Sequence, residues 1–557
     1  MQTVQAPNTT RHPGAGRRMA RDTPKGRQVG DAARQTIAVM LAGRDRHRDL
    51  LIEHLHLIQD AHGRIPTDLL AALAEAMRLS FAEVYEVATF YAHFDITDSD
   101  PPVLIRVCDS IACQLQGADA LAATIAAGTT ARLQKVPCVG RCDQAPVAAV
   151  GQNYIDRATP AQVLATLAEA ATGAVLPPAI DYDAYCLNGG YETLTRLRAG
   201  ALSGEAVLQA LDDAKLAGKG GAGFPTGRKW RTVRDQPGTR LMAVNGDEGE
   251  PGTFKDRHYL ETDPHRFLEG MLIAAEVVGA AEIYIYLRDE YPAARAILTA
   301  ELAKLPAGGP RIHLRRGAGA YVCGEESAMI ESIEGKRGLP RHKPPFVFQH
   351  GLFGHPTLVN NVETLWWVRD IVERGGDWWR GHGRRGRTGL ISFSVSGRVA
   401  APGVKLAPAG ITLRELIDEF CGGMAPGHVL RAYLPGGASG GILPSSLADV
   451  PLDFGTLEPY GSFIGSAAVV VFSAADDLRA VALNLMRFFR HESCGQCTPC
   501  RLGTEKATAL MEREAWDLDL LQELSAVMRD ASICGLGQAA PNPFLTLARH
   551  FPEEFGK

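Results

Sequence analysis

The sequence predicts a multidomain α/β protein whose last part is a helical bundle. At 557 residues the chain is too long for a single hydrophobic core. Short β-type runs alternate with helical periodicity through most of its length, whereas the residues after 476 show helical periodicity alone. Two sets of four cysteines with metal-type spacings fall in two of the predicted domains. The chain is therefore expected to divide into several domains, two of which bind metal.

Composition argues against several classes of protein. The chain is 46% hydrophobic and 22% charged, with a formal net charge of −5. A nucleic-acid-binding protein would carry a basic stripe, so no nucleic-acid partner is expected. No run of 18 uncharged apolar residues occurs, and the best candidate, 271–287, contains Glu276 and Glu282, so no membrane span is expected. Eight of the eleven cysteines fall in two sets with metal-type spacings, which indicates a reducing compartment, and the predicted location is the cytoplasm.

The N-terminal part divides into a basic arm and a helical module. In the first thirty residues six Lys and Arg side chains face only Asp22. No apolar region follows Arg17 and Arg18, which argues against a twin-arginine signal, and a transit peptide stays open on composition. We predict a flexible arm over 1–36 that becomes ordered against a partner. Helical periodicity then predicts a helical module over 37–100.

Residues 101–178 alternate between short β-type runs and helices, which is typical of a small α/β domain of thioredoxin type. This domain holds the first cysteine set, with the spacing C-x4-C-x24-C-x3-C. The set consists of Cys108, Cys113, Cys138 and Cys142. Four thiolates on two loops can bind a [2Fe-2S] cluster, two for each iron. Zinc is the alternative, and disulfide redox chemistry is disfavoured because the set contains no CxxC pair.

The second cysteine set lies in the C-terminal bundle, with the spacing C-x2-C-x2-C-x33-C. It consists of Cys494, Cys497, Cys500 and Cys534. Three close thiolates and one remote thiolate suit a cubane [4Fe-4S] cluster. Structural zinc sites usually use pairs of CxxC knuckles, so zinc is the less favoured alternative. The other cysteines that we considered, Cys186, Cys323 and Cys421, are predicted to be packed thiols.

Two stretches in the middle of the chain have the character of a ligand site. Gly218, Gly220 and Gly223 fit GxGxxG by letter, but a predicted helix over 187–216 precedes them where a dinucleotide fold has a strand. Their exposed amides can still bind an anion. A β-type run over 240–244 then leads into three carboxylates and several glycines, at the strand end where α/β folds bind ligands.

A family resemblance is carried by residues 51–94, which include ATFYAHF, and by the cysteine pattern that follows. They resemble the thioredoxin-like [2Fe-2S] subunit of respiratory complex I, and the chain after Asp181 resembles the flavoprotein subunit of the same complex. Such fusions occur in β (diaphorase) subunits of soluble NAD-dependent formate dehydrogenases and in diaphorase subunits of NAD-reducing hydrogenases. The stretches VCDSIAC, PCVGRCDQAP, DYDAYCLNGGY and ASICGLGQAAPNP look most similar to the formate dehydrogenase β subunits.

The resemblance implies FMN and NAD(H) as cofactors beside the [2Fe-2S] and [4Fe-4S] clusters. It implies a Rossmann-like FMN and NAD(H)-binding α/β domain over 179–387, a β-grasp (SLBB-like) insert over 388–470 and a helical [4Fe-4S] domain over 471–557. Within the insert, the glycine-rich stretch 434–441 lacks the Lys-Ser/Thr ending of a P-loop, so nucleoside triphosphate binding is not expected.

The resemblance also implies site residues. The glycine loop matches the FMN-binding loop, the acidic turn matches flavin contacts with Glu250 on the nicotinamide side, and 357–364 matches a second flavin segment. An acidic residue at Glu250 suits ribose hydroxyls and favours NADH over NADPH. The implied cofactor-binding residues are Gly218, Lys219, Gly220, Gly221, Ala222, Gly223, Phe224, Lys229, Asn245, Asp247, Glu248, Glu250, Tyr321, Gly324, Glu325, Glu326, Lys343, Phe346, Val359, Asn360, Asn361 and Thr364. Thr232 stands where the complex I protein has an aromatic residue, which leaves part of the nucleotide stacking open.

Tyr321 and Glu325 are the predicted catalytic residues, in binding and electrostatic roles, because hydride transfer to a flavin needs no acid–base pair. The predicted function is transfer of electrons from a formate-oxidising α subunit through clusters to FMN and NAD+. That partner would hold a molybdopterin or tungstopterin, with a small additional iron–sulfur subunit as an option. The alternatives are a hydrogenase diaphorase, a fused NADH dehydrogenase subunit of complex I, a self-sufficient ferredoxin-type oxidoreductase, and a non-catalytic scaffold.

Overall fold

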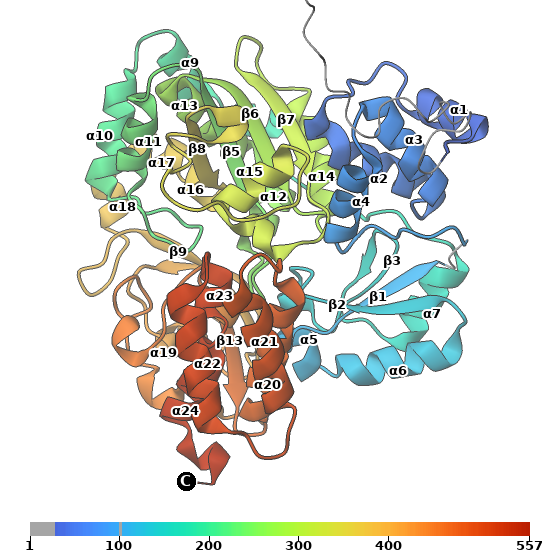
Figure 1. The fold of residues 1–557 in the computed structure, drawn as a ribbon. Helices are drawn as coiled ribbons and strands as arrows, with labels where there is room; N and C mark the ends of the chain where they lie inside the picture. The colour runs from blue at the N-terminus through green and yellow to red at the C-terminus, as the bar shows by residue number, and fades with distance from the viewer. Residues whose placement is uncertain (1–27, 100–102, 557) are drawn as a thin grey trace, which may run out of the picture.

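The computed structural model describes residues 28–99 and 103–556, and Figure 1 shows their arrangement. The first 27 residues of the predicted basic arm lie outside this part of the chain. Helix α1 (Asp31–Met40) occupies the end of the range 1–36, so the arm is shorter than predicted. The buried residues of α1 lie about one turn apart and pack against helix α3 of the next module.

The helical module lies beside strand β7 of the central sheet (Figure 1). Besides α1 it consists of α2 (Leu51–His62), α3 (Thr67–Met77) and α4 (Phe81–Phe90). Pro66 precedes α3, where its missing N–H costs no helical hydrogen bond. Helix α4 begins with a capping box in which Ser80 and Glu83 satisfy each other's backbone N–H. The starts of these two helices are therefore encoded in the local sequence.

The second domain has a sheet of order β2-β1-β3-β4, with α6 and α7 packed together on it (Figure 1). Its elements are β1 (Leu104–Cys108), α5 (Ile111–Leu115), α6 (Ala118–Gly128), β2 (Arg132–Val136), β3 (Ala148–Val150), β4 (Asn153–Ile155) and α7 (Pro160–Ala168). Strand β1 runs parallel to β2 and antiparallel to β3. The sequence did not reveal β2, because Arg132, Gln134 and Lys135 leave this edge strand without an apolar pattern.

The central domain, over residues 179–387, is built on a sheet of order β7-β6-β5-β8. Its strands are β5 (Arg240–Gly246), β6 (Ala280–Leu287), β7 (Arg311–Arg316) and β8 (Thr357–Asn361). Each neighbouring pair is parallel. In chain order this is 3-2-1-4, so the direction of winding reverses between β5 and β8. Ligands of doubly wound folds bind at such a switch point, outside the carboxyl ends of the strands.

Helices surround this sheet, and two of the predicted ones are broken in the structure. They are α8 (Tyr182–Leu187), α9 (Glu192–Arg198), α10 (Gly204–Ala214), α11 (Thr226–Arg234), α12 (Lys255–Thr262), α13 (Pro264–Val278), α14 (Pro292–Leu302), α15 (Glu326–Ile333), α16 (Val362–Trp366), α17 (Val368–Arg374) and α18 (Gly376–Arg380). The helix predicted over 187–216 is divided near Gly200, and the helix that periodicity predicts over 366–379 is divided at Gly375. Both glycines have positive φ, which ends a helix.

The β insert forms a mixed sheet of order β10-β9-β13-β11-β12 below the central domain in Figure 1. Its strands are β9 (Leu390–Gly397), β10 (Gly403–Pro408), β11 (Leu430–Leu434), β12 (Leu443–Pro444) and β13 (Ala468–Ser473). Strand β13 lies parallel to β9 in the middle of the sheet, so the predicted boundary at residue 470 falls inside a strand. Periodicity over 412–420 predicts one helix, and the structure has α19 (Leu413–Glu415) followed by a π-helical turn.

The C-terminal helices close the molecule beneath the central domain (Figure 1). They are α20 (Leu478–Glu492), α21 (Thr498–Met511), α22 (Leu518–Ala531), α23 (Gly535–Ala539) and α24 (Asn542–His550). One hydrophobic cluster contains side chains of these helices, of the helical module and of the central domain around Val322. These parts therefore share a core. In the described part of the chain, no helix has the length and hydropathy needed to cross a membrane.

Candidate functional site

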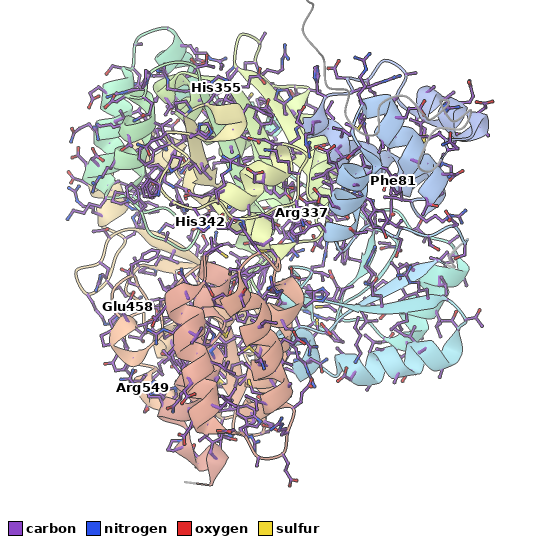
Figure 2. The ribbon with its side chains drawn as sticks, viewed as in Figure 1. Phe81, Arg337, His342, His355, Glu458 and Arg549 are labelled. Carbon is purple, nitrogen blue, oxygen red and sulfur yellow. The ribbon has the colours of Figure 1, made fainter. Side chains whose placement is uncertain are left out.

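A cavity of about 980 Å³ lies at the switch point, where the central domain, the β insert and the C-terminal helices meet. The central domain contributes loops after β5 and β8 and the glycine loop, and the other two parts contribute residues such as Gly436, Ser439 and Arg529. Two further lining residues, Glu458 and Arg549, are labelled in Figure 2 on the side where the insert and the last helices meet. The site therefore needs all three parts of the chain.

The glycine loop enters the cavity with its middle residues. Gly220, Gly221 and Ala222 line the cavity with Lys219. A side chain at Gly220 would meet Asn361 Cβ at 3.2 Å, and Gly221 has φ +112°, so both positions favour glycine. The Lys219 ammonium points away and donates to a backbone carbonyl of the insert, and burial lowers its pKa.

The remaining predicted residues of this loop do not line the cavity. Gly218 closes the loop by donating its N–H to the carbonyl of Phe224, 2.9 Å away, and Gly223 packs against Phe454. The Phe224 side chain is 41% exposed. The Lys229 ammonium donates to a backbone carbonyl of β8, and burial lowers its pKa. These residues belong to the loop or follow it, but they lie outside the cavity lining.

The turn after β5 is held by hydrogen bonds of its own carboxylates and amides. The Asn245 amide donates to the Gly324 carbonyl at 2.9 Å and accepts from the Asp247 N–H at 3.0 Å. Glu248 accepts from the first backbone N–H groups of α12 and from the Tyr291 hydroxyl. Burial, with the Asp256 charge second, raises the pKa of Glu248 to about 7.

Asp247 is the member of this turn that is left without a partner. Its Oδ2 atom is buried and has no hydrogen-bond partner in the described residues. Burial raises its pKa well above the usual value. Because an unsatisfied buried carboxyl oxygen costs free energy, its place in the cavity wall is suited to a bound ligand that donates or accepts there.

Glu250 lies at the end of the same turn, where it contacts Tyr321, and both residues line the cavity. Tyr321 donates its hydroxyl proton to Glu250, and the Ser439 N–H donates to the other Glu250 oxygen at 2.7 Å. Burial raises the pKa of Glu250. The Tyr321 N–H donates to the Glu492 carboxylate at 2.8 Å, and burial raises the pKa of Glu492 to about 7. Tyr321 is therefore fixed at both ends, in the cavity wall.

Glu325 also lines the cavity, but its carboxylate is occupied. One oxygen caps α15 by accepting from the N–H groups of Ser327 and Ala328, each at 2.9 Å. The other oxygen accepts from the Lys343 ammonium, which also pairs with Glu326 at 2.7 Å. Glu326, Lys343 and the exposed Phe346 do not line the cavity. Their predicted contact with a nucleotide stays a prediction.

The second predicted segment places only one of its side chains in the cavity. Asn361 lines it, whereas the Asn360 side chain turns inward and accepts from the Trp230 indole at 2.9 Å. Successive side chains of a strand point to opposite faces, so the two asparagines cannot both face the ligand. Val359 lies under the loop, and the Thr364 hydroxyl accepts from the Lys219 N–H at 2.8 Å.

The sequence analysis missed a buried charge cluster in the cavity floor. Lys255, which is 1% exposed, lies 2.8 Å from Asp256 and 3.0 Å from Glu363. Asp256 in turn accepts from the Asn361 amide, and Glu363 accepts from the Ser392 N–H of the insert. Burial lowers the pKa of Lys255, but the surrounding carboxylates outweigh it and raise the pKa overall. The signal that the sequence offered for this cluster was the position of Lys255 and Asp256, shortly after the Gly-rich acidic turn.

The cysteines of the C-terminal set come together beside this cavity. Cys494, Cys497, Cys500 and Cys534 line one small space of about 10 Å³. Cys497 and Cys534 are the N-cap residues of α21 and α23. Burial raises the pKa of Cys500 to about 12 and that of Cys534 to about 11. Cys534 also lines the large cavity, so the two spaces share a wall.

The other set is buried in the second domain. Cys108 ends β1, Cys113 lies in α5, and Cys138 and Cys142 share the loop after β2. The sulfur atoms of this last pair are 3.3 Å apart. Hydrogen bonds from the neighbouring thiols lower the pKa of Cys138. Among the described residues no three Cys, His, Asp or Glu side chains are grouped as round a single metal ion. An iron–sulfur cluster differs from a single-ion site because its cysteine ligands are distributed over several irons.

Comparison with known proteins identifies the family. The chain matches three family models: the thioredoxin-like [2Fe-2S] ferredoxin over residues 37–171, the Nuo51 FMN-binding domain over 211–370, and the NADH-ubiquinone oxidoreductase-F iron–sulfur binding region over 480–557. An F-type subunit of the NADH-quinone oxidoreductase of Rhizobium meliloti is 40% identical over 390 residues, which are 67% of this chain and 92% of that protein. The chain belongs to the family of NADH-quinone oxidoreductase F-type subunits.

Other relatives and a solved structure extend the comparison. The mitochondrial NADH-ubiquinone oxidoreductase 51 kDa subunit of Neurospora crassa is 43% identical over 62% of this chain and 76% of its own length. A chain in the crystal structure of an NAD+-reducing [NiFe]-hydrogenase in the H2-reduced state is 34% identical, with a TM-score of 0.81. The alignment covers 92% of this chain and 93% of that one. The chain is thus an NAD-dependent oxidoreductase subunit with FMN, [2Fe-2S] and [4Fe-4S] regions.

The residues of the cavity fit the flavin and nucleotide that this family implies. Glycines 220 and 221 allow close approach of a phosphate, and Asp247 offers a buried unpaired oxygen. The residues that sequence reasoning missed lie mainly in the other two parts of the chain. They include Gly249, Thr253, Lys255 and Asp256, then Gly436, Ser439, Gly461, Ser462, Phe463, Gly465 and Ser466 of the insert, and then Arg529, Asn542 and Arg549. The glycines of 434–441 were the available signal in the insert.

Proposed function

We propose that this chain is the diaphorase subunit of an NAD-dependent formate dehydrogenase and works in the cytoplasm. The observation that supports its diaphorase chemistry is the position of the large cavity between the cysteine sets. Cys534 lies in its wall, and Glu248 in the same wall is connected through Arg288 to the carbonyl of Cys138. A ligand in this cavity is therefore next to both groups of candidate cluster ligands.

FMN, when bound, exchanges two electrons as a hydride with NAD(H) and single electrons with iron–sulfur clusters. The residues of this chain bind and orient it. Gly220 and Gly221 would present backbone without side chains to its phosphate, and Asn245 and Asp247, which line the cavity, would hold its ring. The Lys255 cluster fixes Asn361 from below.

The nucleotide is held at the edge formed by Glu250 and Tyr321. Glu250 is fixed by the Tyr321 hydroxyl and the Ser439 N–H, so its carboxylate is positioned for ribose hydroxyls and repels a 2′-phosphate. Glu325 caps α15 and pairs with Lys343, which fixes its carboxylate in the cavity wall. Tyr321 and Glu325 thus act by orientation and charge.

The formate-oxidising partner is inferred from the four sequence stretches that resemble formate dehydrogenase β subunits. In this proposal a molybdopterin or tungstopterin α subunit, with or without a small iron–sulfur subunit, supplies electrons to the cluster at Cys494, Cys497, Cys500 and Cys534. The cluster at Cys108, Cys113, Cys138 and Cys142 lies on the other side and stores single electrons.

A second candidate is the diaphorase subunit of an NAD-reducing hydrogenase. It is favoured by the alignment of 92% of this chain with 93% of a chain in the NAD+-reducing [NiFe]-hydrogenase structure, which spans the fused domains. A third candidate is a fused subunit of complex I, since the curated relatives are subunits of NADH-quinone oxidoreductase. All three share the same chemistry at the cavity and differ in the partner.

Mild affinity purification from the native host tests the proposal. Copurifying subunits are identified by mass spectrometry, and NAD+ reduction is measured with formate and with hydrogen. Formate-driven reduction with a pterin-binding subunit supports the proposal, whereas hydrogen-driven reduction with a nickel subunit selects the second candidate. A preparation without a visible flavin spectrum would refute every diaphorase assignment.

A matched pair of variants tests the electron path. Cys497→Ser should abolish donor-driven NAD+ reduction and keep bound FMN, because Cys497 lies in the small cysteine space and outside the flavin cavity. Cys421→Ser is the control, since Cys421 is a buried thiol of the insert that belongs to neither set.

A further inference from the structure

Arg288 connects the loop of the [2Fe-2S] cysteines to the wall of the flavin cavity. It follows β6 directly and is only 5% exposed. One terminal nitrogen donates to the Glu248 carbonyl at 2.6 Å, and the other donates to the Cys138 carbonyl at 2.7 Å. The second nitrogen also pairs with the Glu290 carboxylate at 2.6 Å. A single guanidinium thus holds two loops that lie 110 residues apart in the sequence, as Cys138 and Glu248 show.

A neighbouring tyrosine repeats the connection. The Arg288 guanidinium lies 5.1 Å from the centre of the Tyr291 ring, and the Tyr291 hydroxyl donates to the Glu248 carboxylate at 3.0 Å. On its other side Tyr291 packs against Gly140, where a Cβ atom would come within 2.2 Å of the hydroxyl oxygen. Only glycine permits this contact between the cysteine loop and the cavity wall.

A further small cavity of about 30 Å³ lies between the same two sites. Its lining includes Cys138, Arg288 and Glu290, together with Asp247 and Tyr321 of the flavin cavity. The charged groups are therefore enclosed between the sites and poorly screened by water. A fixed charge acts more strongly there than at the surface.

We propose that Arg288 is a positioning residue that favours the reduced state of the [2Fe-2S] cluster and at the same time holds the Glu248 turn of the flavin cavity. Reduction adds one electron, and hence one negative charge, to the cluster beside this cation. The positive charge of Arg288 lowers the free energy of that state, and the negative charge of Glu290 opposes it. The inference rests on the proposed assignment of Cys138 as a cluster ligand.

The two effects are separable by the choice of variant. Arg288→Gln removes both the positive charge and the forked guanidinium that reaches its three acceptors. Glu290→Gln removes the opposing negative charge. Arg288→Lys keeps the positive charge but cannot bridge the three acceptors. Arg315→Gln is the control, because Arg315 is equally buried but pairs with Asp49 at the far strand β7.

The test is a redox titration of the purified full-length chain, monitored by electron paramagnetic resonance, with the [4Fe-4S] signal as internal reference. Arg288→Gln should lower the equilibrium constant for reduction of the [2Fe-2S] cluster about tenfold, which is about 59 mV for one electron. Glu290→Gln should shift it in the opposite direction, and Arg315→Gln should not shift it. Arg288→Lys should keep the potential and raise the KM for NADH at unchanged kcat.

Shifts of the same sign in Arg288→Gln and Glu290→Gln, or no shift in either, would overturn the inference. If Arg288→Gln does not retain its cluster, the inference is tested by the other two variants. The reduction potential of the [2Fe-2S] cluster should rise in Glu290→Gln and stay unchanged in Arg288→Lys, and any other result would overturn the inference. Cys138→Ala separates the underlying assignment, because alanine has no atom that binds iron, and a [2Fe-2S] signal that persists in this variant shows that Cys138 is not a ligand, whatever Arg288 does.

Discussion

Replacing Lys255 with methionine should weaken flavin binding strongly. The Lys255 ammonium is almost fully buried and neutralises Asp256 and Glu363, which hold Asn361 and the β insert in place. Removing one partner of a buried ion pair costs about 3–5 kcal/mol, because the remaining charge stays buried without compensation. If half of that cost is borne by the cavity floor, the dissociation constant for FMN rises more than tenfold, since each 1.4 kcal/mol is a factor of ten.

Titration of flavin-depleted protein with FMN, followed by fluorescence, measures this directly. The chain has several domains, so its heat denaturation is not two-state and a melting temperature alone is not a measure of the site. The double variant Lys255→Met, Glu363→Gln should recover part of the affinity, because it removes both charges. Arg315→Met is the matched control: it breaks a buried pair with Asp49 away from the cavity and should leave FMN affinity unchanged. Wild-type affinity in Lys255→Met would refute the reasoning.

Further predictions concern single groups of the site. Glu248 has a pKa of about 7 against an ordinary value of 4.5, so the folded chain binds this proton more tightly than the unfolded chain. The denaturant concentration at which the flavin site unfolds should therefore fall as pH rises from about 4.5 to about 7, and Glu248→Gln should flatten that part of the pH series. Gly221→Ala places a side chain at φ +112° and should weaken FMN binding about 5- to 30-fold, measured by the same titration. Cys497→Ser should lose the [4Fe-4S] resonance at unchanged flavin content; loss of both would contradict the assignment. Glu250→Gln should lower the ratio of NADH to NADPH activity, and an unchanged ratio would count against its role.

Much of the site could be predicted because its residues follow directly on a strand or share one loop. Sequence reasoning singled out the turn after β5 and the glycine loop as candidate ligand segments, and both contribute residues to the cavity. The two cysteine sets were found because ligand spacing is a property of the sequence itself. The family model at residues 211–370 covers the turn and the glycine loop, and the models at 37–171 and 480–557 cover the two cysteine sets.

The rest depends on contacts that no local pattern contains. Asn360 and Asn361 look equivalent in the sequence, but strand geometry turns one of them towards Trp230 and away from the cavity. Lys255 looks like an ordinary surface lysine at a helix start, and its burial follows from the packing of the insert against α12. Arg288 is likewise an arginine after a strand until the second domain is placed against it.

The division of the cavity among three parts of the chain has a consequence for assembly. The central domain supplies the glycine loop and the acidic turn, but Ser439 of the insert and Cys534 of the last helices complete the walls. A ligand that contacts all three stabilises their arrangement by mass action, because it binds only the assembled state. The same arrangement places Cys534 in the cavity wall, which in the proposed assignment brings the cluster ligand next to the flavin. Flavin binding and the geometry for electron transfer are therefore two results of one packing arrangement, and a variant that loosens the insert should weaken both together.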